Sequence, residues 1–272
     1  MQVYRGMDIG TAKPSPDERS EVDYAMIDVC DPEEPFSVAD FQREARVAVS
    51  GLVAAGRRVI VVGGSGLHMR ALVDPMEFPP HDHDVRTAVR SLGGEAAREQ
   101  LLVADPHAGQ VVDLANPRRV ERALEVFRLT GQTPSERSAA PDARRLAAYE
   151  PLLEFGGLGV DPAGELEARV RARFAGMMAA GLLDEVAGLA GRLGPTARQA
   201  VGYKELVPVV AGALSLDEGV EQAIRATLAL AKRQRTYFRR DPRFTWIRWE
   251  SDASRRYVGF RSEVDRLMSW TS

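Results

Sequence analysis

The chain is 272 residues long, enough for one large domain or two modest ones, and its 44% hydrophobic and 28% charged residues are typical of a globular protein. A net charge of −3 argues against nucleic-acid binding by the surface as a whole. One cysteine excludes a disulfide framework and a cysteine-based zinc cluster, and no apolar run is long enough to span a membrane, so we expect a protein of the reducing cytoplasm.

The first 73 residues predict alternating strands and helices, the pattern of a parallel α/β sheet with right-handed crossovers. Ser37 is a suitable N-cap for a helix that ends at Gly56, and the β-branched run after Gly56 predicts a strand buried on both faces. Cys30 lies in an apolar stretch and is expected to be a buried small hydrophobe. The predicted elements are a strand at 24–30, a helix at 37–56, a strand at 57–62, a Gly-rich turn at 63–66 and a helix at 67–73.

The pattern changes after residue 73, where prolines interrupt the chain and helical segments follow without a convincing strand. We therefore predict a helical insertion domain at 79–149, within a core domain made of residues 1–78 and 150–272. The elements predicted here are helices at 84–92, 94–103 and 117–130, a linker at 133–144, a strand at 151–160, a helix at 215–238, a strand at 244–249 and a C-terminal helix.

The turn Gly63-Gly-Ser-Gly66 follows a predicted buried strand and precedes a helix. Such a turn exposes backbone N–H groups that suit an anion or a polar ligand, and Ser65 would add a hydroxyl. The alternative is a tight turn with a serine cap, which is common. The turn lacks the Gly-Lys-Ser/Thr of a nucleotide-binding P-loop, and the dipeptide Gly-Lys occurs nowhere in the chain.

The segment Ala231–Arg240 holds five basic residues and no acidic one. Two converging guanidinium groups bind diphosphate through paired hydrogen bonds, so Arg233 and Arg239 are candidate diphosphate ligands. Six residues apart on a regular helix, they would point about 120° apart in azimuth, and only long side chains or a frayed helix end would let them meet. A solvated, Arg-rich helix end explains the composition equally well.

The segment Asn116–Val126 begins a helix at Pro117 and places Arg118 and Arg122 on one face. This arrangement suits a nucleic-acid backbone, but surface ion pairs of Arg118 with Glu121 and of Arg122 with Glu125 are slightly favoured. The stretch His81-Asp-His-Asp84 has no further His or Cys nearby and is interpreted as a solvated turn rather than a metal site.

Taken together, six segments of the chain resemble the bacterial tRNA dimethylallyltransferases (adenine-37 isopentenyltransferases), a branch of the P-loop fold. They fall in the family's order and span nearly the whole chain. The segments are MQVYRGMDIGTAKP at 1–14, SVADF at 37–41, VGGSGL at 62–67, NPRRVERALEV at 116–126, QAVGYKEL at 199–206 and KRQRTYFR at 232–239. The departures from the family pattern are Ser65 for Thr, His68 for Tyr, Tyr237 for Trp and Arg118 for a frequent Gln.

The resemblance implies a P-loop-NTPase-like parallel sheet flanked by helices, with a helical insertion that contacts tRNA. It implies transfer of a dimethylallyl group from dimethylallyl diphosphate, with Mg²⁺, to N6 of adenosine 37 in the anticodon loop of tRNAs that read codons beginning with U. A monomer is expected.

The resemblance also assigns residues to roles. Ser65, Arg233 and Arg239 would be catalytic, the two arginines would bind diphosphate, and all three would face one hollow. The residues implied in tRNA binding are Met1, Gln2, Ser65, Thr87, Arg118, Arg119, Val120, Glu121 and Arg122.

In the family, the first strands with the P-loop and a general-base Asp come before the position equivalent to Met1, and neither motif occurs in this sequence. We therefore expect the 272-residue chain to be inactive, and poorly soluble because the strand at 57–62 would lack a paired neighbour. One alternative is an RNA-binding protein without catalysis. Another P-loop enzyme, such as a small-molecule kinase, is disfavoured by the motifs on the tRNA side.

Overall fold

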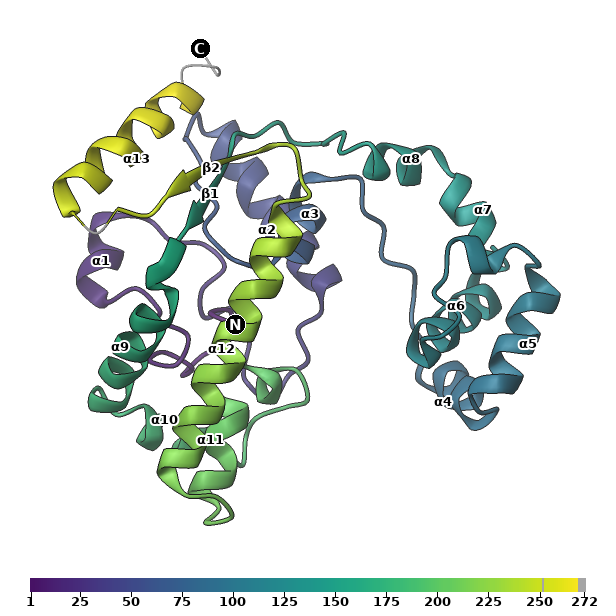
Figure 1. Cartoon of the computed structure of the whole chain (residues 1–272). Helices are drawn as coiled ribbons and strands as arrows, with labels where there is room; N and C mark the ends of the chain where they lie inside the picture. The colour runs from purple at the N-terminus through teal and green to yellow at the C-terminus, as the bar shows by residue number, and fades with distance from the viewer. Residues whose placement is uncertain (251, 269–272) are drawn as a thin grey trace. The chain divides into compact units, whose positions relative to one another are not determined.

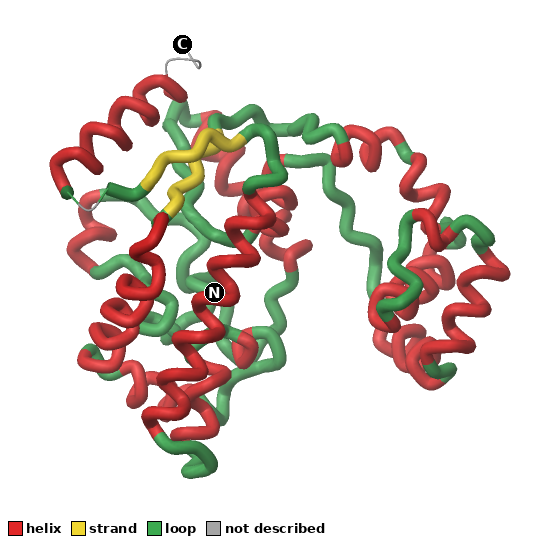
Figure 2. Tube along the Cα trace, viewed as in Figure 1, coloured by secondary structure: helices red, strands yellow, loops and turns green. Residues whose placement is uncertain are grey.

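The structure is a computed structural model that describes residues 1–250 and 252–268. The chain divides into two compact units, Met1–Leu72 with Phe155–Ser272, and Val73–Glu154. Helices make up most of each unit, and the two strands of the described residues lie in the first unit (Figures 1 and 2).

Two long helices of the first unit, α2 and α12, begin at clear capping residues. The hydroxyls of Ser37 and Ser215 accept the N–H of the residue three positions on, and each serine N–H donates back to that residue's carboxylate. The helices predicted at 37–56, 67–73 and 215–238 are confirmed. The unit contains α1 (Pro16–Glu21), α2 (Val38–Ala54), α3 (Gly66–Val73), α9 (Leu166–Ala179), α10 (Leu182–Leu189), α11 (Tyr203–Val210), α12 (Leu216–Phe238) and α13 (Ala253–Met268).

The sheet consists of β1 (Gly157–Asp161) and β2 (Phe244–Arg248), which pair in parallel. Gly157 lies opposite Phe244, and Asp161 lies opposite Arg248. Parallel pairing agrees with the predicted fold class. β2 falls within the strand predicted at 244–249, and β1 overlaps the end of the strand predicted at 151–160, whose first six residues form no strand. The sheet is much smaller than predicted, because the described residues form only these two strands.

The strand predicted at 24–30 is wrong. Met26 and Asp28 have φ angles of +63° and +56°, which break the extended backbone, and only an isolated parallel bridge joins Tyr4 to Cys30. Cys30 is buried as predicted, and burial, followed by the carboxylate of Glu34, raises its pKa to about 11, so the thiol stays protonated.

The strand predicted at 57–62 is also wrong. The segment forms no strand, and its apolar side chains face solvent, with Ile60 78% exposed and Val62 90% exposed. A run of β-branched residues favours an extended backbone, but a strand of a parallel sheet also needs a hydrogen-bonded neighbour. Within the described residues, none lies beside this segment.

The core of the first unit gathers around the start of the chain. Tyr4 and Met7 are 1% and 0% exposed and pack against apolar residues of α9 to α12, among them Phe174, Tyr203 and Ile224. The opening loop is therefore anchored to the helices whose last member, α12, carries the basic cluster.

The second unit is a helical domain with its own core. Its helices are α4 (His83–Ser91), α5 (Gly94–Ala104), α6 (Pro117–Thr130), α7 (Pro134–Ala139) and α8 (Pro141–Ala147). The three longer helices confirm those predicted in this region, and they pack through buried residues that include Val89, Leu101 and Leu124. The linker predicted at 133–144 is wrong, because Thr133 and Glu136 form a capping box that begins α7.

No helix among the described residues is long and apolar enough to cross a membrane.

Candidate functional site

The opening loop, residues 1–13, is fixed by a buried cation. The side chain of Lys13 is only 2% exposed, and its ammonium group donates to the carboxylates of Asp8, at 2.7 Å, and Asp28, at 2.5 Å. Burial alone would raise the pKa of Asp28, but hydrogen bonds from Lys13 and Arg19 outweigh it and hold that pKa below its usual value. The loop is therefore braced by charge-assisted bonds.

A carboxylate from α10 holds the same loop from the other side. Glu185 accepts hydrogen bonds from the backbone N–H groups of Asp8, Ile9 and Gly10 at 2.8, 2.8 and 3.1 Å, and from the hydroxyl of Tyr203 at 2.5 Å. Burial, and then Glu185 itself, raise the pKa of Tyr203, so this hydroxyl remains a donor. These partners lie up to 177 residues apart in sequence, and no local pattern could have predicted the contact.

The braced loop in turn positions a predicted tRNA-binding residue. The side-chain amide of Gln2 donates to the carbonyls of Thr11 at 3.1 Å and Ala12 at 2.9 Å. Met1, the other predicted tRNA contact on this loop, is 49% exposed. The position of Gln2 therefore depends on the loop that Lys13 and Glu185 hold in place.

Ser65 lies in the Gly-rich loop that precedes α3. Its Oγ is 2.7 Å from Nδ1 of His68, and the His68 ring stands edge-on to Phe41 with centroids 4.8 Å apart. Burial lowers the pKa of His68, so the imidazole is neutral at physiological pH. A neutral imidazole can exchange one hydrogen bond with Ser65, in a direction set by its tautomer.

The glycines of this loop allow it to pack directly on α12. A side chain at Gly66 would overlap the ring of Tyr237, and one at Gly64 would overlap the amide of Gln234. The loop carrying Ser65 therefore lies against the basic end of α12, two segments that are far apart in sequence. The sequence predicted that these glycines expose their N–H groups to a ligand, but it did not predict their close packing on α12.

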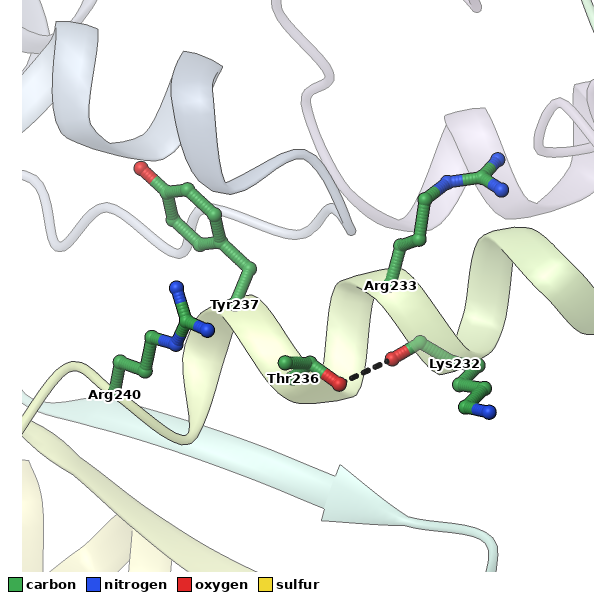
Figure 3. A pocket seen from close by; sticks show the side chains of 5 residues that line it. All are labelled: Lys232, Arg233, Thr236, Tyr237 and Arg240. Atoms are coloured by element: carbon green, nitrogen blue, oxygen red, sulfur yellow. Dashed lines mark hydrogen bonds between the residues drawn. The ribbon is translucent and has the colours of Figure 1, made fainter. Parts of the chain in front are cut away.

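A pocket of about 280 Å³ lies along the C-terminal end of α12 (Figure 3). Arg233 and Tyr237 project from the same side of the helix, and Tyr237 is the residue that meets the Gly-rich loop. In the part of the chain that the structure describes, no carboxylate pairs with the pocket's three cationic side chains. Cations without counter-ions around a hollow suit a phosphate or diphosphate group. The lining residues are Lys232, Arg233, Thr236, Tyr237 and Arg240.

Arg239, the second predicted diphosphate ligand, does not line this pocket. Its Nη2 lies 2.6 Å from a carboxylate oxygen of Asp161 at the end of β1, and its guanidinium lies 5.5 Å from the ring centroid of Trp246. Arg235 approaches the same carboxylate at 3.5 Å. Of the three residues expected to face one hollow, only Arg233 lines this pocket. Ser65 does not line it, although the neighbouring glycines lie against α12, and Arg239 is directed toward the sheet, as the separation of the two arginines in azimuth on α12 allows.

The remaining predicted tRNA-binding residues belong to the second unit. Val120 is 1% exposed, so its side chain packs in the core of that unit. Glu121 pairs with Arg90 at 3.6 Å rather than with Arg118. The predicted pair of Arg122 with Glu125 is confirmed at 3.0 Å, although Glu125 is buried rather than on the surface. The exposed members of the set are Thr87, Arg118 and Arg119, and Arg119 lies 3.7 Å from the carboxylate of Asp113.

Mg²⁺ is usually held by one or two carboxylates together with substrate phosphates. The lining of the pocket contains no carboxylate, and the described residues contain no group of three His, Cys, Asp or Glu placed to hold a metal ion. The residues present do not form a Mg²⁺ site by themselves, and no step below depends on one. In the stretch His81–Asp84, Asp82 caps α4 by accepting the N–H groups of Asp84 and Val85.

Comparison with known proteins gives a consistent result. Residues 2–241 match the family model described as IPP transferase. A protein named tRNA dimethylallyltransferase from Streptomyces avermitilis is 41% identical over 255 residues, which are 91% of this chain and 79% of that protein. A protein of the same name from Thermobifida fusca is 40% identical over 258 residues, covering 92% of this chain and 79% of the relative.

Solved structures are similar over nearly the whole chain. A tRNA isopentenylpyrophosphate transferase from Bacillus halodurans is 32% identical with a TM-score of 0.66, covering 98% of this chain and 86% of that one. A tRNA delta(2)-isopentenylpyrophosphate transferase from Staphylococcus epidermidis is 28% identical with a TM-score of 0.68, covering 100% of this chain and 89% of that one. A eukaryotic dimethylallyltransferase described as acting on tRNA has a TM-score of 0.76 at 22% identity, covering 98% and 71%, and shows the fold alone.

Proposed function

The chain belongs to the tRNA dimethylallyltransferase (IPP transferase) family, and we propose that it contributes to transfer of the dimethylallyl group of dimethylallyl diphosphate to N6 of adenosine 37 in the anticodon loop of tRNAs that read codons beginning with U. One observation carries this proposal at the level of the site. A pocket lined by three cations without carboxylate partners among the described residues lies beside the Gly-rich loop that holds Ser65.

The reaction makes two demands on such a site. The allylic C–O bond to diphosphate breaks while a C–N bond forms, and the N6 amine, a poor nucleophile, must lose a proton to a base. Diphosphate leaves only when its developing charge is neutralised, which is a role for preorganised cationic donors. The pocket meets the second demand.

We assign the diphosphate to the pocket, with Arg233 as its principal ligand. A guanidinium can hold two phosphate oxygens through parallel N–H···O bonds, and Lys232 and Arg240 add positive charge nearby. Arg239 is the second proposed ligand. To reach the diphosphate, its guanidinium must exchange the carboxylate of Asp161 for a phosphate oxygen.

Ser65 is proposed to hydrogen-bond where the adenine meets the prenyl donor. Its hydroxyl already exchanges a hydrogen bond with neutral His68, so it is oriented before substrate arrives. An adenosine in an anticodon loop is single-stranded, and moving it out of the stack into such a site costs only a few kcal/mol.

The proposed tRNA-binding surface has two parts. One is the opening loop with Met1 and Gln2, and the other is in the second unit, with Thr87 and the residues Arg118 to Arg122. We accordingly propose the division of labour in which a core domain of residues 1–78 and 150–272 holds the prenyl donor and an insertion at 79–149 contacts the tRNA, as a monomer.

We further propose that a polypeptide of residues 1–272 alone binds its substrates without turnover. No carboxylate lines the pocket to take the N6 proton, and the 272 residues contain no Gly-Lys pair. The alternative that these observations favour is an RNA-binding protein that does not catalyse.

The test combines binding and turnover. Residues 1–272 are titrated with an anticodon stem-loop RNA and with dimethylallyl diphosphate, then incubated with both, and the RNA is analysed by mass spectrometry. We expect binding of both substrates and no added dimethylallyl mass. Product that disappears when adenosine 37 is replaced by guanosine would support the transferase and refute inactivity. Failure to bind either substrate would refute the proposed function.

A further inference from the structure

The second unit contains a buried carboxylate that two arginines share. Glu125 on α6 has a side chain only 2% exposed. Its oxygens accept hydrogen bonds from Nε and Nη2 of Arg86 at 3.3 and 3.4 Å, and one lies 3.0 Å from Nη1 of Arg122. The side chains of Arg86 and Arg122 are 39% and 37% exposed, so part of each side chain remains accessible.

Further contacts fix the geometry of this cluster. Arg122 donates from Nη2 to the carbonyl of Pro79 at 2.8 Å and from Nη1 to that of Pro80 at 3.1 Å, and the N–H of Asp82 donates to Glu125 at 3.4 Å. The carboxylate thus joins α6, α4 and the segment before α4. Removing it would leave partly buried donors without this acceptor and would release the contacts between these segments.

The cluster carries an excess of positive charge. Two guanidiniums share one carboxylate. Burial lowers the pKa of nearby Arg137, the charge of Arg122 lowers it further, and the carboxylate of Glu77 partly opposes this shift. Burial alone would raise the pKa of Glu125, but the hydrogen bonds from Arg86 and Arg122 hold it below its usual value, so the carboxylate is ionised at neutral pH. A fixed pair of accessible guanidiniums with net positive charge suits a backbone phosphate.

We propose that Arg86 and Arg122 form one phosphate-binding pair for the tRNA backbone, and that buried Glu125 is the positioning residue that holds the pair in register. The inference rests on the proposed function, because it assumes that the second unit contacts tRNA. It adds Arg86, the neighbour of Thr87 on α4, to the contact surface and gives Glu125 a part in RNA binding without any contact to RNA.

The direction in which one substitution changes RNA affinity distinguishes a positioning role of Glu125 from a simple effect of its charge. Glu125→Gln removes a negative charge near a polyanion, and electrostatics alone would make RNA bind more tightly. If Glu125 positions the two arginines, the same substitution weakens binding. Glu99→Gln makes an equal change of charge at an exposed residue of α5 in the same unit and is the matched control.

The experiment measures binding of a fluorescently labelled anticodon stem-loop RNA by anisotropy over a range of salt concentrations. Arg86→Ala and Arg122→Ala are each expected to raise Kd about tenfold, the loss typical of a charge-assisted hydrogen bond. Each should also reduce the slope of log K against log salt by about one. Glu125→Gln should raise Kd about threefold or more, and this effect should vanish in the Arg122→Ala background.

Several outcomes would overturn the inference. One is a Glu125→Gln variant that binds RNA as tightly as wild type or more tightly. Another is a Glu125→Gln substitution that weakens RNA binding as much in the Arg122→Ala background as in wild type. Circular dichroism checks folding. If Glu125→Gln unfolds, the double variant Arg86→Ala/Arg122→Ala provides the test. If the two arginines share one phosphate, the fold-increase in Kd of the double variant must be smaller than the product of the increases of the single variants; a full product would overturn the inference. Wild-type protein that does not bind RNA would instead refute the proposed function.

Discussion

Replacing Glu185 with alanine should release the opening loop from α10. The substitution removes the acceptor for three backbone N–H groups and for the hydroxyl of Tyr203, which is fully buried. An unpaired buried hydroxyl costs about 1–3 kcal/mol, and each of the half-buried amides of Ile9 and Gly10 adds about 1 kcal/mol, while the exposed amide of Asp8 can bond to water. We expect a loss of about 3–5 kcal/mol in the stability of this region.

The loss should be visible locally and globally. For a chain of this size, each kcal/mol corresponds to roughly 2–4 °C in Tm, so the Glu185→Ala variant should melt about 6–20 °C below wild type. Hydrogen exchange should show the amides of residues 8–10 losing protection first. The matched control is Glu99→Ala at an exposed position of α5, where surface substitutions usually change stability by no more than about 0.5 kcal/mol.

Two results would refute this reasoning. One is a loss below about 1 kcal/mol, which would mean that water replaces the carboxylate without penalty. The other is unchanged exchange at residues 8–10, which would mean that the loop is held by Lys13 alone. Because Gln2 is positioned by the same loop, the variant should also bind anticodon stem-loop RNA more weakly.

Three further predictions concern the Tyr203 hydroxyl, the Glu125 carboxylate and the exposed apolar segment at 60–62. Tyr203→Phe should cost only about 1 kcal/mol in urea unfolding, because Glu185 keeps its three amide partners, and a cost near that of Glu185→Ala would contradict the assignment. The pKa of Glu125 is lowered in the folded state from 4.5, so its contribution to stability should be present above about pH 4.5 and lost as the pH falls through the lowered pKa of the folded state. Unfolding followed between pH 3 and 7 should show this loss in wild type and not in Glu125→Gln. Replacing exposed Ile60 and Val62 with lysine should reduce self-association in light scattering, and unchanged aggregation would show that this apolar segment is not its cause.

The sequence predicted helices well where the signal is local. Ser37 and Ser215 marked the starts of α2 and α12, and Pro117 marked the start of α6, because a cap or a first-turn proline acts within a few residues. Of the four predicted strands, those at 151–160 and 244–249 overlap β1 and β2, whereas the run at 57–62 has the right composition but no neighbour among the described residues. A strand depends on a partner that composition does not specify.

The site was predictable in composition and less so in geometry. The basic residues at the end of α12 predicted either an anion site or a solvated helix end, and Arg233 lines a pocket there. Binding of an anion in that pocket stays a prediction. That Asp161 would bind Arg239, and that Gln234 and Tyr237 would pack on the Gly-rich loop, depends on contacts between distant segments. The same holds for Glu185, whose partners are in the first residues of the chain.

The most direct test of the account is the affinity of the α12 pocket for diphosphate. Isothermal titration of residues 1–272 with inorganic pyrophosphate should show binding that Arg233→Ala weakens at least tenfold, the loss of a charge-assisted pair of hydrogen bonds. Arg225→Ala, which removes an exposed arginine from the same helix, should leave the affinity within about twofold of wild type. Equal affinities for wild type and Arg233→Ala would contradict the placement of the leaving group in this pocket.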